Sequence, residues 1–122
     1  MQDDLPKRRL ERLRREYSRK RRDALVQLGE TLLRSRGIAL PASIPDRERL
    51  AQIEAYIDVI RSKEREVEDW KQHRDHAAKL GKIKQVQFRE QMIAAMEGQV
   101  ARHREELRRL ESMPGSFWTG ST

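Results

Sequence analysis

A single heptad register runs through the last third of the chain and restricts this part to a long, packed helix. Four apolar residues recur every seven positions, and a second set follows three positions after them: Val86, Ile93, Val100 and Leu107, then Arg89, Met96, His103 and Leu110. This spacing places the side chains on one side of a helix and is typical of a coiled coil. We therefore expect the four heptad residues to form a helix-packing seam, with His103 as a polar seam residue that helps to set the register.

Composition and periodicity extend this prediction to the whole chain. Ala, Glu, Lys, Leu and Arg make up 62 of the 122 residues, which is typical of long helices when helical periodicity is also present. The pattern predicts helices over about 5–36, 44–80 and 82–112, in a single domain over residues 1–112. The expected fold is all-α, with long amphipathic helices that form an antiparallel coiled-coil hairpin or a three-helix bundle.

Glycine, proline and capping residues mark the expected helix ends. Gly37 holds the position of a helix-terminating glycine, and Ser43 with Asp46 matches a capping box that opens the second helix. Lysines around Gly81 favour a tight turn there, although one glycine is also tolerated inside a continuous helix. In that alternative the second and third helices would join into an elongated coiled coil. Pro114 ends the last helix, and residues 113–122 are predicted to form a flexible tail.

The positive charge of the chain is concentrated at its N-terminal end. Residues 1–36 hold twelve cations and six anions, a net charge of +6, whereas residues 37–122 hold fifteen and fourteen, a net charge of +1. At 100° per residue, five arginines form one row along the first helix: Arg8, Arg12, Arg15, Arg19 and Arg22. Leu10, Leu13 and Tyr17 lie on the opposite side, and we expect the helix to bury them.

Three interpretations of the Arg row stay open. The first is a solvated surface, on which the pairs Asp4–Arg8, Glu11–Arg15 and Arg12–Glu16 neutralise part of the charge. Alternatively, the row binds an acidic protein or the phosphates of a nucleic acid. The chain has no Asn, the usual adenine reader, so nucleic-acid binding would be directed at the backbone and would depend strongly on salt. We do not expect binding to a membrane.

The stretch RKRRDALVQLGETLLRSRGI, residues 19–38, resembles the basic-then-LxxLG segment of small accessory proteins of conjugal transfer and mobilisation. The resemblance covers about a sixth of the chain, and no family is assigned from it.

The sequence offers little for catalysis or for a cofactor. There is no cysteine, which excludes disulfides, thiol nucleophiles and Cys-ligated metals. There is also no phosphate-binding Gly-rich loop, no nucleophile elbow and no H-E-x-x-H motif. His73 and His76 have a spacing that metal sites use, but in so charged a chain exposed histidines are the simpler interpretation. We predict no enzyme activity, no cofactor and no metal site.

The expected function is therefore non-enzymatic assembly or adaptor binding through helical faces, with the basic helix towards an acidic partner. Phe117 and Trp118 follow the helix-breaking Pro114, and a short arm with two aromatic residues suits docking into a partner. Packing of these two aromatics back onto the bundle is the alternative. Self-association is compatible with the narrow apolar seams. No signal-peptide core and no long apolar stretch are present, so we expect a soluble cytoplasmic protein.

Overall fold

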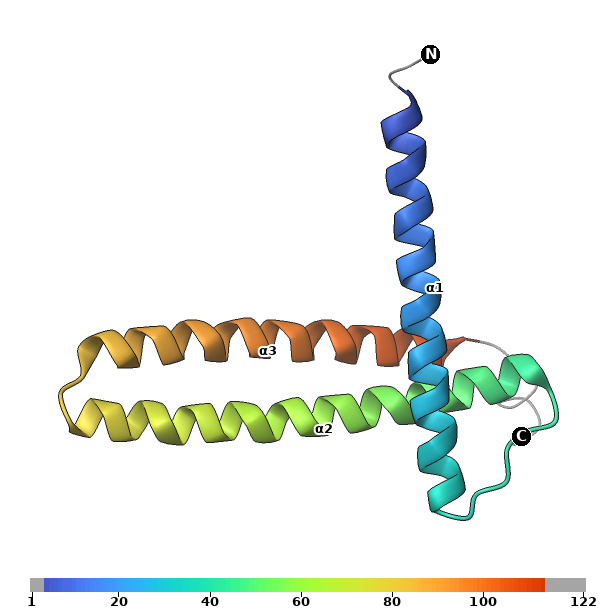
Figure 1. Cartoon of the computed structure of the whole chain (residues 1–122). Helices are drawn as coiled ribbons and strands as arrows, with labels where there is room; N and C mark the ends of the chain where they lie inside the picture. Colours follow the sequence, from blue (N-terminus) through green and yellow to red (C-terminus); the bar gives the residue numbers. More distant parts are fainter. Residues whose placement is uncertain (1–3, 114–122) are drawn as a thin grey trace. The chain divides into compact units, whose positions relative to one another are not determined.

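The computed structural model describes residues 4–113 and confirms the predicted all-α fold (Figure 1). Its helices are α1 (Asp4–Ser35), α2 (Ile44–Lys79) and α3 (Ile83–Ser112), and no strand occurs among these residues. The described chain divides into two compact units, one ending at Ala55 and the next beginning at Tyr56, so the boundary falls inside α2. The prediction of a single domain over residues 1–112 stays a prediction.

Each interhelical connection has, as its second residue, a glycine in the left-handed backbone region. Gly37 has φ +73° and Gly81 has φ +71°, values that residues with a Cβ rarely adopt. At the end of α1, the Ile38 amide donates to the Leu33 carbonyl at 3.0 Å, which is one bond of a Schellman motif. At the end of α2, the Lys82 amide donates to the Ala77 carbonyl at 3.0 Å in the same arrangement. Gly81 is therefore a turn residue and does not lie within a continuous helix.

In the first unit, α1 packs closely against the beginning of α2. At Gly29, a Cβ would overlap the carbonyl oxygen of Ala51 and would lie 2.6 Å from the Ala51 Cα atom. Leu33, Ala51 and Ala55 are buried around this contact. The Arg36 guanidinium donates to Glu54 Oε2 at 2.6 Å and joins the C-terminal end of α1 to α2. The two backbones can approach so closely because the residues between them are small.

In the second unit, α2 and α3 form an antiparallel hairpin around the turn at Gly81 (Figure 1). Val67 of α2 packs with Ile93 and Met96 of α3 in a buried cluster, and Trp70 covers its edge. Trp70 also meets the ring of Phe88 edge-on at 6.1 Å between centroids, and the Arg89 guanidinium lies 5.7 Å from the centre of the Trp70 ring. These contacts place aromatic and cationic groups where the two helices face one another.

The predicted seam residues of α3 differ in how far they are covered. Ile93 and Val100 are buried, whereas Val86 and Leu107 are partly buried. His103 lies in the same hairpin, with its ring 5.7 Å from that of Tyr56, a buried residue of α2. Packing of the knobs-into-holes type stays a prediction. Within residues 4–113, no helix combines the length and the apolar character that crossing a membrane requires.

Candidate partner-binding site

The N-terminal part of α1 carries the predicted Arg row and is the candidate site. We call residues 6–24 the basic segment, which holds ten cations and three anions. Every arginine of the row is exposed: Arg8, Arg12, Arg15, Arg19 and Arg22. Because the arginines are spaced alternately by four and three residues, they lie along one side of the helix over about 21 Å. The whole row is open to solvent.

The cations of the basic segment are not neutralised by ion pairs. Of the pairs suggested by the sequence, Glu11–Arg15 and Arg12–Glu16 do not form, and the side chain of Asp4 lies outside the described part. Exposed pairs of this kind contribute only about 0.3–0.5 kcal/mol, and holding two long side chains in one geometry has an entropic cost of similar size. The basic segment therefore keeps a net charge of +7, ten cations less three anions, on a surface exposed to solvent.

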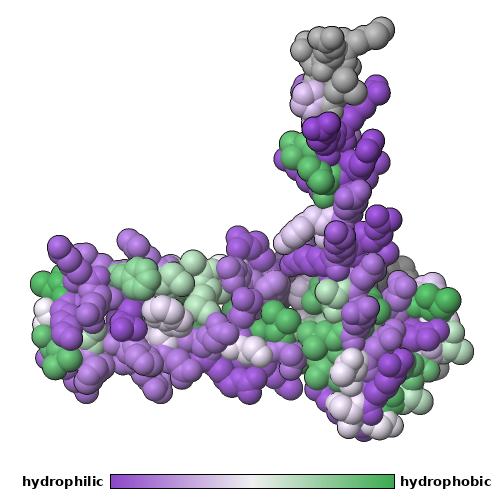
Figure 2. All heavy atoms as spheres, in the orientation of Figure 1, coloured by the Kyte–Doolittle hydropathy of each residue, from purple (hydrophilic) through white to green (hydrophobic). Residues whose placement is uncertain are grey.

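The opposite side of the basic segment is exposed as well, and the prediction that it is buried is wrong. The exposed fractions are 48% for Leu10, 55% for Leu13 and 70% for Tyr17. Figure 2 shows apolar surface on this part of α1, surrounded by hydrophilic side chains. The pattern of apolar residues indicates which side of a helix avoids water, but it does not indicate whether anything covers that side. Between residues 6 and 35 of α1, the buried residues are Gly29 and Leu33, which lie about one and a half and two and a half turns beyond the end of the basic segment.

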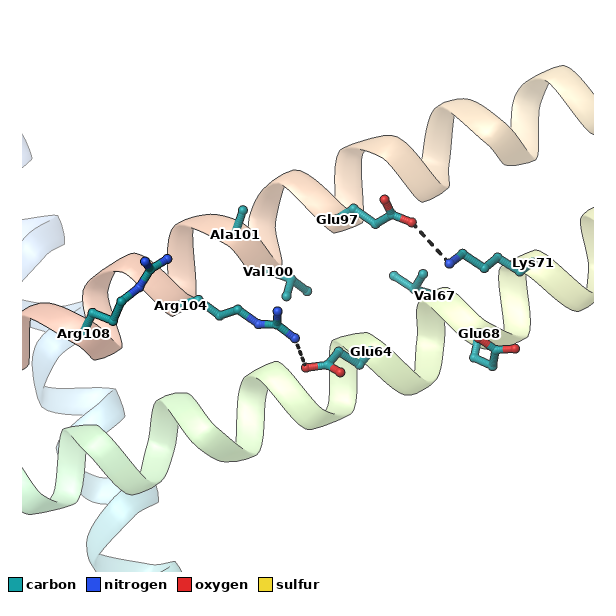
Figure 3. Close-up of a pocket in the computed structure, with 9 residues that line it drawn as sticks. All are labelled: Glu64, Val67, Glu68, Lys71, Glu97, Val100, Ala101, Arg104 and Arg108. Carbon is teal, nitrogen blue, oxygen red and sulfur yellow. Dashed lines mark hydrogen bonds and ion pairs between the residues drawn. The ribbon is translucent and has the colours of Figure 1, made fainter. Parts of the chain in front are cut away.

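A groove runs along the hairpin in the second unit. It encloses about 540 Å³, and Val67 and Val100 lie at its base (Figure 3). Two ion pairs cross it: the Arg104 guanidinium contacts Glu64 at 2.8 Å, and the Lys71 ammonium contacts Glu97 at 3.6 Å. Charged side chains thus span the groove and tie α2 to α3. We assign this groove to the packing of the hairpin.

The histidines and clustered carboxylates of α2 do not converge on a metal site. Both His73 and His76 are exposed, and the His73 Nδ1–H donates to the Asp69 carbonyl oxygen at 2.7 Å within its own helix. Glu66 and Asp69 line a cavity of about 290 Å³ together with Trp70, His73 and Arg89. Between residues 4 and 113, no group of three or more His, Asp or Glu side chains is arranged to hold a metal ion.

The predicted docking residues Phe117 and Trp118 lie outside the described residues. The contribution of the tail therefore stays a prediction. Comparison with known proteins gives no match to a family model, to a curated protein or to a solved structure. Among the described surfaces of the chain, the basic segment has the most concentrated charge.

Proposed function

We propose that this protein is a non-enzymatic assembly or adaptor protein that binds an acidic protein partner through the basic segment of α1. The observation that carries the proposal is the exposure of the Arg row without any ion pair within residues 6–24. Ten cations against three anions leave a net charge of +7 on about five helical turns, so the cations repel one another, and a surface serving only solubility has no need of so one-sided a distribution. An acidic partner relieves this repulsion and gains in association rate from the attraction.

The hairpin fits the same proposal as a rigid scaffold. Its helices are joined by a buried cluster and by cross-helix ion pairs, and binding residues are positioned more precisely on packed helices than on loops. We propose that Phe117 and Trp118 act as a secondary anchor on the partner and that the protein works in the cytoplasm. Self-association through helical faces is a further part of the proposal. The proposed function requires neither a cofactor nor a metal.

Nucleic acid is the second candidate partner, because the spacing of the Arg row also suits a row of phosphates. Five exposed guanidinium groups along one side of a helix suit the phosphates of a nucleic-acid backbone. Such binding would carry little sequence information, because the contacts would be to phosphates and not to base edges.

A triple variant with matched controls tests both candidates. The variant changes Arg12, Arg15 and Arg19 to Ala, and the control changes Lys79, Lys84 and Arg102 to Ala, three exposed cations of the hairpin that form no ion pair. Both variants lose three positive charges. A difference in binding between them therefore shows that the location of the charges in the Arg row matters, and not only the net charge of the chain.

Each assay uses the full chain. In pull-downs, we expect acidic proteins to be recovered by the wild-type chain and the control but not by the Arg variant. In gel shifts with duplex and single-stranded DNA, retardation that persists near physiological salt and is lost only in the Arg variant would favour nucleic acid. Equal recovery of partners by all three chains would contradict the role of the Arg row. The Phe117→Ala, Trp118→Ala double variant tests the tail, and unchanged partner recovery would remove it from the proposal.

A further inference from the structure

The exposed apolar residues of the basic segment point to a more specific partner. Leu10, Leu13 and Tyr17 are spaced by three and four residues, so they form one line along α1, which we call the apolar strip. Roughly half or more of each side chain is open to solvent. Contiguous apolar surface rimmed by polar groups marks an interaction site more often than does a single exposed apolar residue.

The charges that border the apolar strip define what can cover it. At 100° per residue, Arg9 and Lys20 lie along one side of the strip, and Arg14 and Arg21 lie along the other. All four are exposed. The three anions of the basic segment lie farther round the helix, beyond these cations. A partner that packs on the strip therefore meets positive charge at both of its edges.

This arrangement disfavours a second copy of the chain. Two apolar strips placed face to face would bring cations against cations along both edges, and like charges at such positions are destabilising. Nucleic acid would satisfy the cations but would leave the apolar side chains uncovered, and the Arg row on the opposite side of the helix suits phosphates better. An element with apolar residues at its centre and carboxylates at both edges would cover the apolar strip and pair with the cations on each side of it.

We infer that the apolar strip, with its four bordering cations, binds an amphipathic helix of the partner that has an apolar seam and acidic residues on both flanks. The seam would pack against Leu10, Leu13 and Tyr17 with the spacing of a helix pair, and the flanking carboxylates would pair with the bordering cations. This inference rests on the proposed function, because both require an acidic partner, but it adds that the partner is helical and covers the strip.

Designed peptides provide the probes. The first has three heptads, with Leu at the seam positions and Glu at both flanks; repulsion between the flanks keeps it from pairing with itself at neutral pH. The second replaces the seam Leu residues by Ala and keeps the acidic flanks. The third keeps the Leu seam and replaces the flanking Glu residues by Lys. Binding of each labelled peptide to the full chain is followed by fluorescence anisotropy.

The variant of the chain changes Leu10 and Leu13 to Gln, a good helix former that removes the apolar contact. The control changes Leu80 and Ile83 to Gln, because these aliphatics of the hairpin are exposed to a similar degree, 56% and 69%. Circular dichroism checks that both variants keep their helix content. We expect the first peptide to bind at least tenfold more tightly than the other two. Its affinity should fall about tenfold or more in the Leu10, Leu13 variant and stay within twofold in the control.

Other outcomes separate this inference from the proposed function. Equal binding of the two acidic peptides would overturn the inference and leave an acidic partner in place, whereas failure of both acidic peptides to bind would remove both. Light scattering that shows a dimer in the wild type but not in the Leu10, Leu13 variant would make a second copy the occupant and overturn the inference. Binding to anionic lipid vesicles that is lost in this variant, without peptide binding, would overturn it in favour of a membrane surface.

Discussion

Replacement of Gly29 by alanine tests the close packing of α1 on α2. The added Cβ would overlap the Ala51 carbonyl oxygen and lie 2.6 Å from the Ala51 Cα atom. Both are backbone atoms, which cannot move aside as the end of a flexible side chain can. The two helices must therefore separate, and the contacts of buried Leu33 and Ala55 loosen with them. Overpacking of this kind costs about 1–3 kcal/mol, and the rigid neighbours place Gly29 near the upper end of that range.

Gly98 is the matched control. It lies within α3, is exposed, and a Cβ added there would meet no atom within 4 Å. Alanine stabilises a helix interior by about 1 kcal/mol relative to glycine, and this gain applies at both positions. We therefore expect Gly98→Ala to raise the free energy of unfolding by about 1 kcal/mol. Gly29→Ala combines the same gain with the overpacking penalty, so it should lower the free energy of unfolding by about 2 kcal/mol.

Urea unfolding followed by circular dichroism at 222 nm measures both variants against the wild type. The difference between the two substitutions, about 3 kcal/mol, isolates the packing penalty because the helix propensity cancels. If Gly29→Ala stabilises the protein as much as Gly98→Ala does, α1 and α2 do not approach at this residue and the packing described for the first unit is incorrect.

Three further predictions concern the hairpin and use the same unfolding assay. Gly81→Ala should lower the free energy of unfolding by about 1 kcal/mol, because φ +71° is strained for any residue with a Cβ; an unchanged stability would indicate that the turn does not need this conformation. Ile93→Ala should cost about 3 kcal/mol, since Ile93 is buried in the cluster with Val67, and a loss below 1 kcal/mol would show that the site is not packed. Glu64→Arg should lower stability by less than about 1 kcal/mol, and combining it with Arg104→Glu should restore the wild-type value; failure of the double variant to recover would show that this exposed pair does not form.

The helices of the fold could be predicted because their signals are local. The heptad pattern around Ile93 and Val100 indicated a helix with one packed side, and both residues are buried. Gly37 and Gly81 stand where the apolar periodicity stops, and each adopts the left-handed conformation that only glycine adopts easily. Propensity, periodicity and turn chemistry agree along these segments, which is the condition under which a sequence is informative about its own structure.

The site could be predicted only in part, because exposure depends on what lies nearby. The Arg row followed from spacing alone, but the same spacing suggested that Leu13 and Tyr17 would be buried, and they are exposed. The bordering cations could have indicated this exposure. Burial of the apolar strip against another part of the chain would also bring the positive charges on both of its edges out of water. The close contact at Gly29 could not be predicted from the pattern of apolar residues, because glycine has no side chain that contributes to this pattern.

The turn at Gly81 has a consequence for how copies of the chain relate to one another. The contacts described between α2 and α3, such as the pair of Lys71 with Glu97, do not require that both helices belong to one molecule. If residue 81 became helical, α2 would continue into α3, and two molecules would exchange their C-terminal helices while making the same contacts. A substitution that disfavours positive φ there would penalise the closed hairpin and not the exchanged form, so Gly81 favours a molecule that is complete in itself.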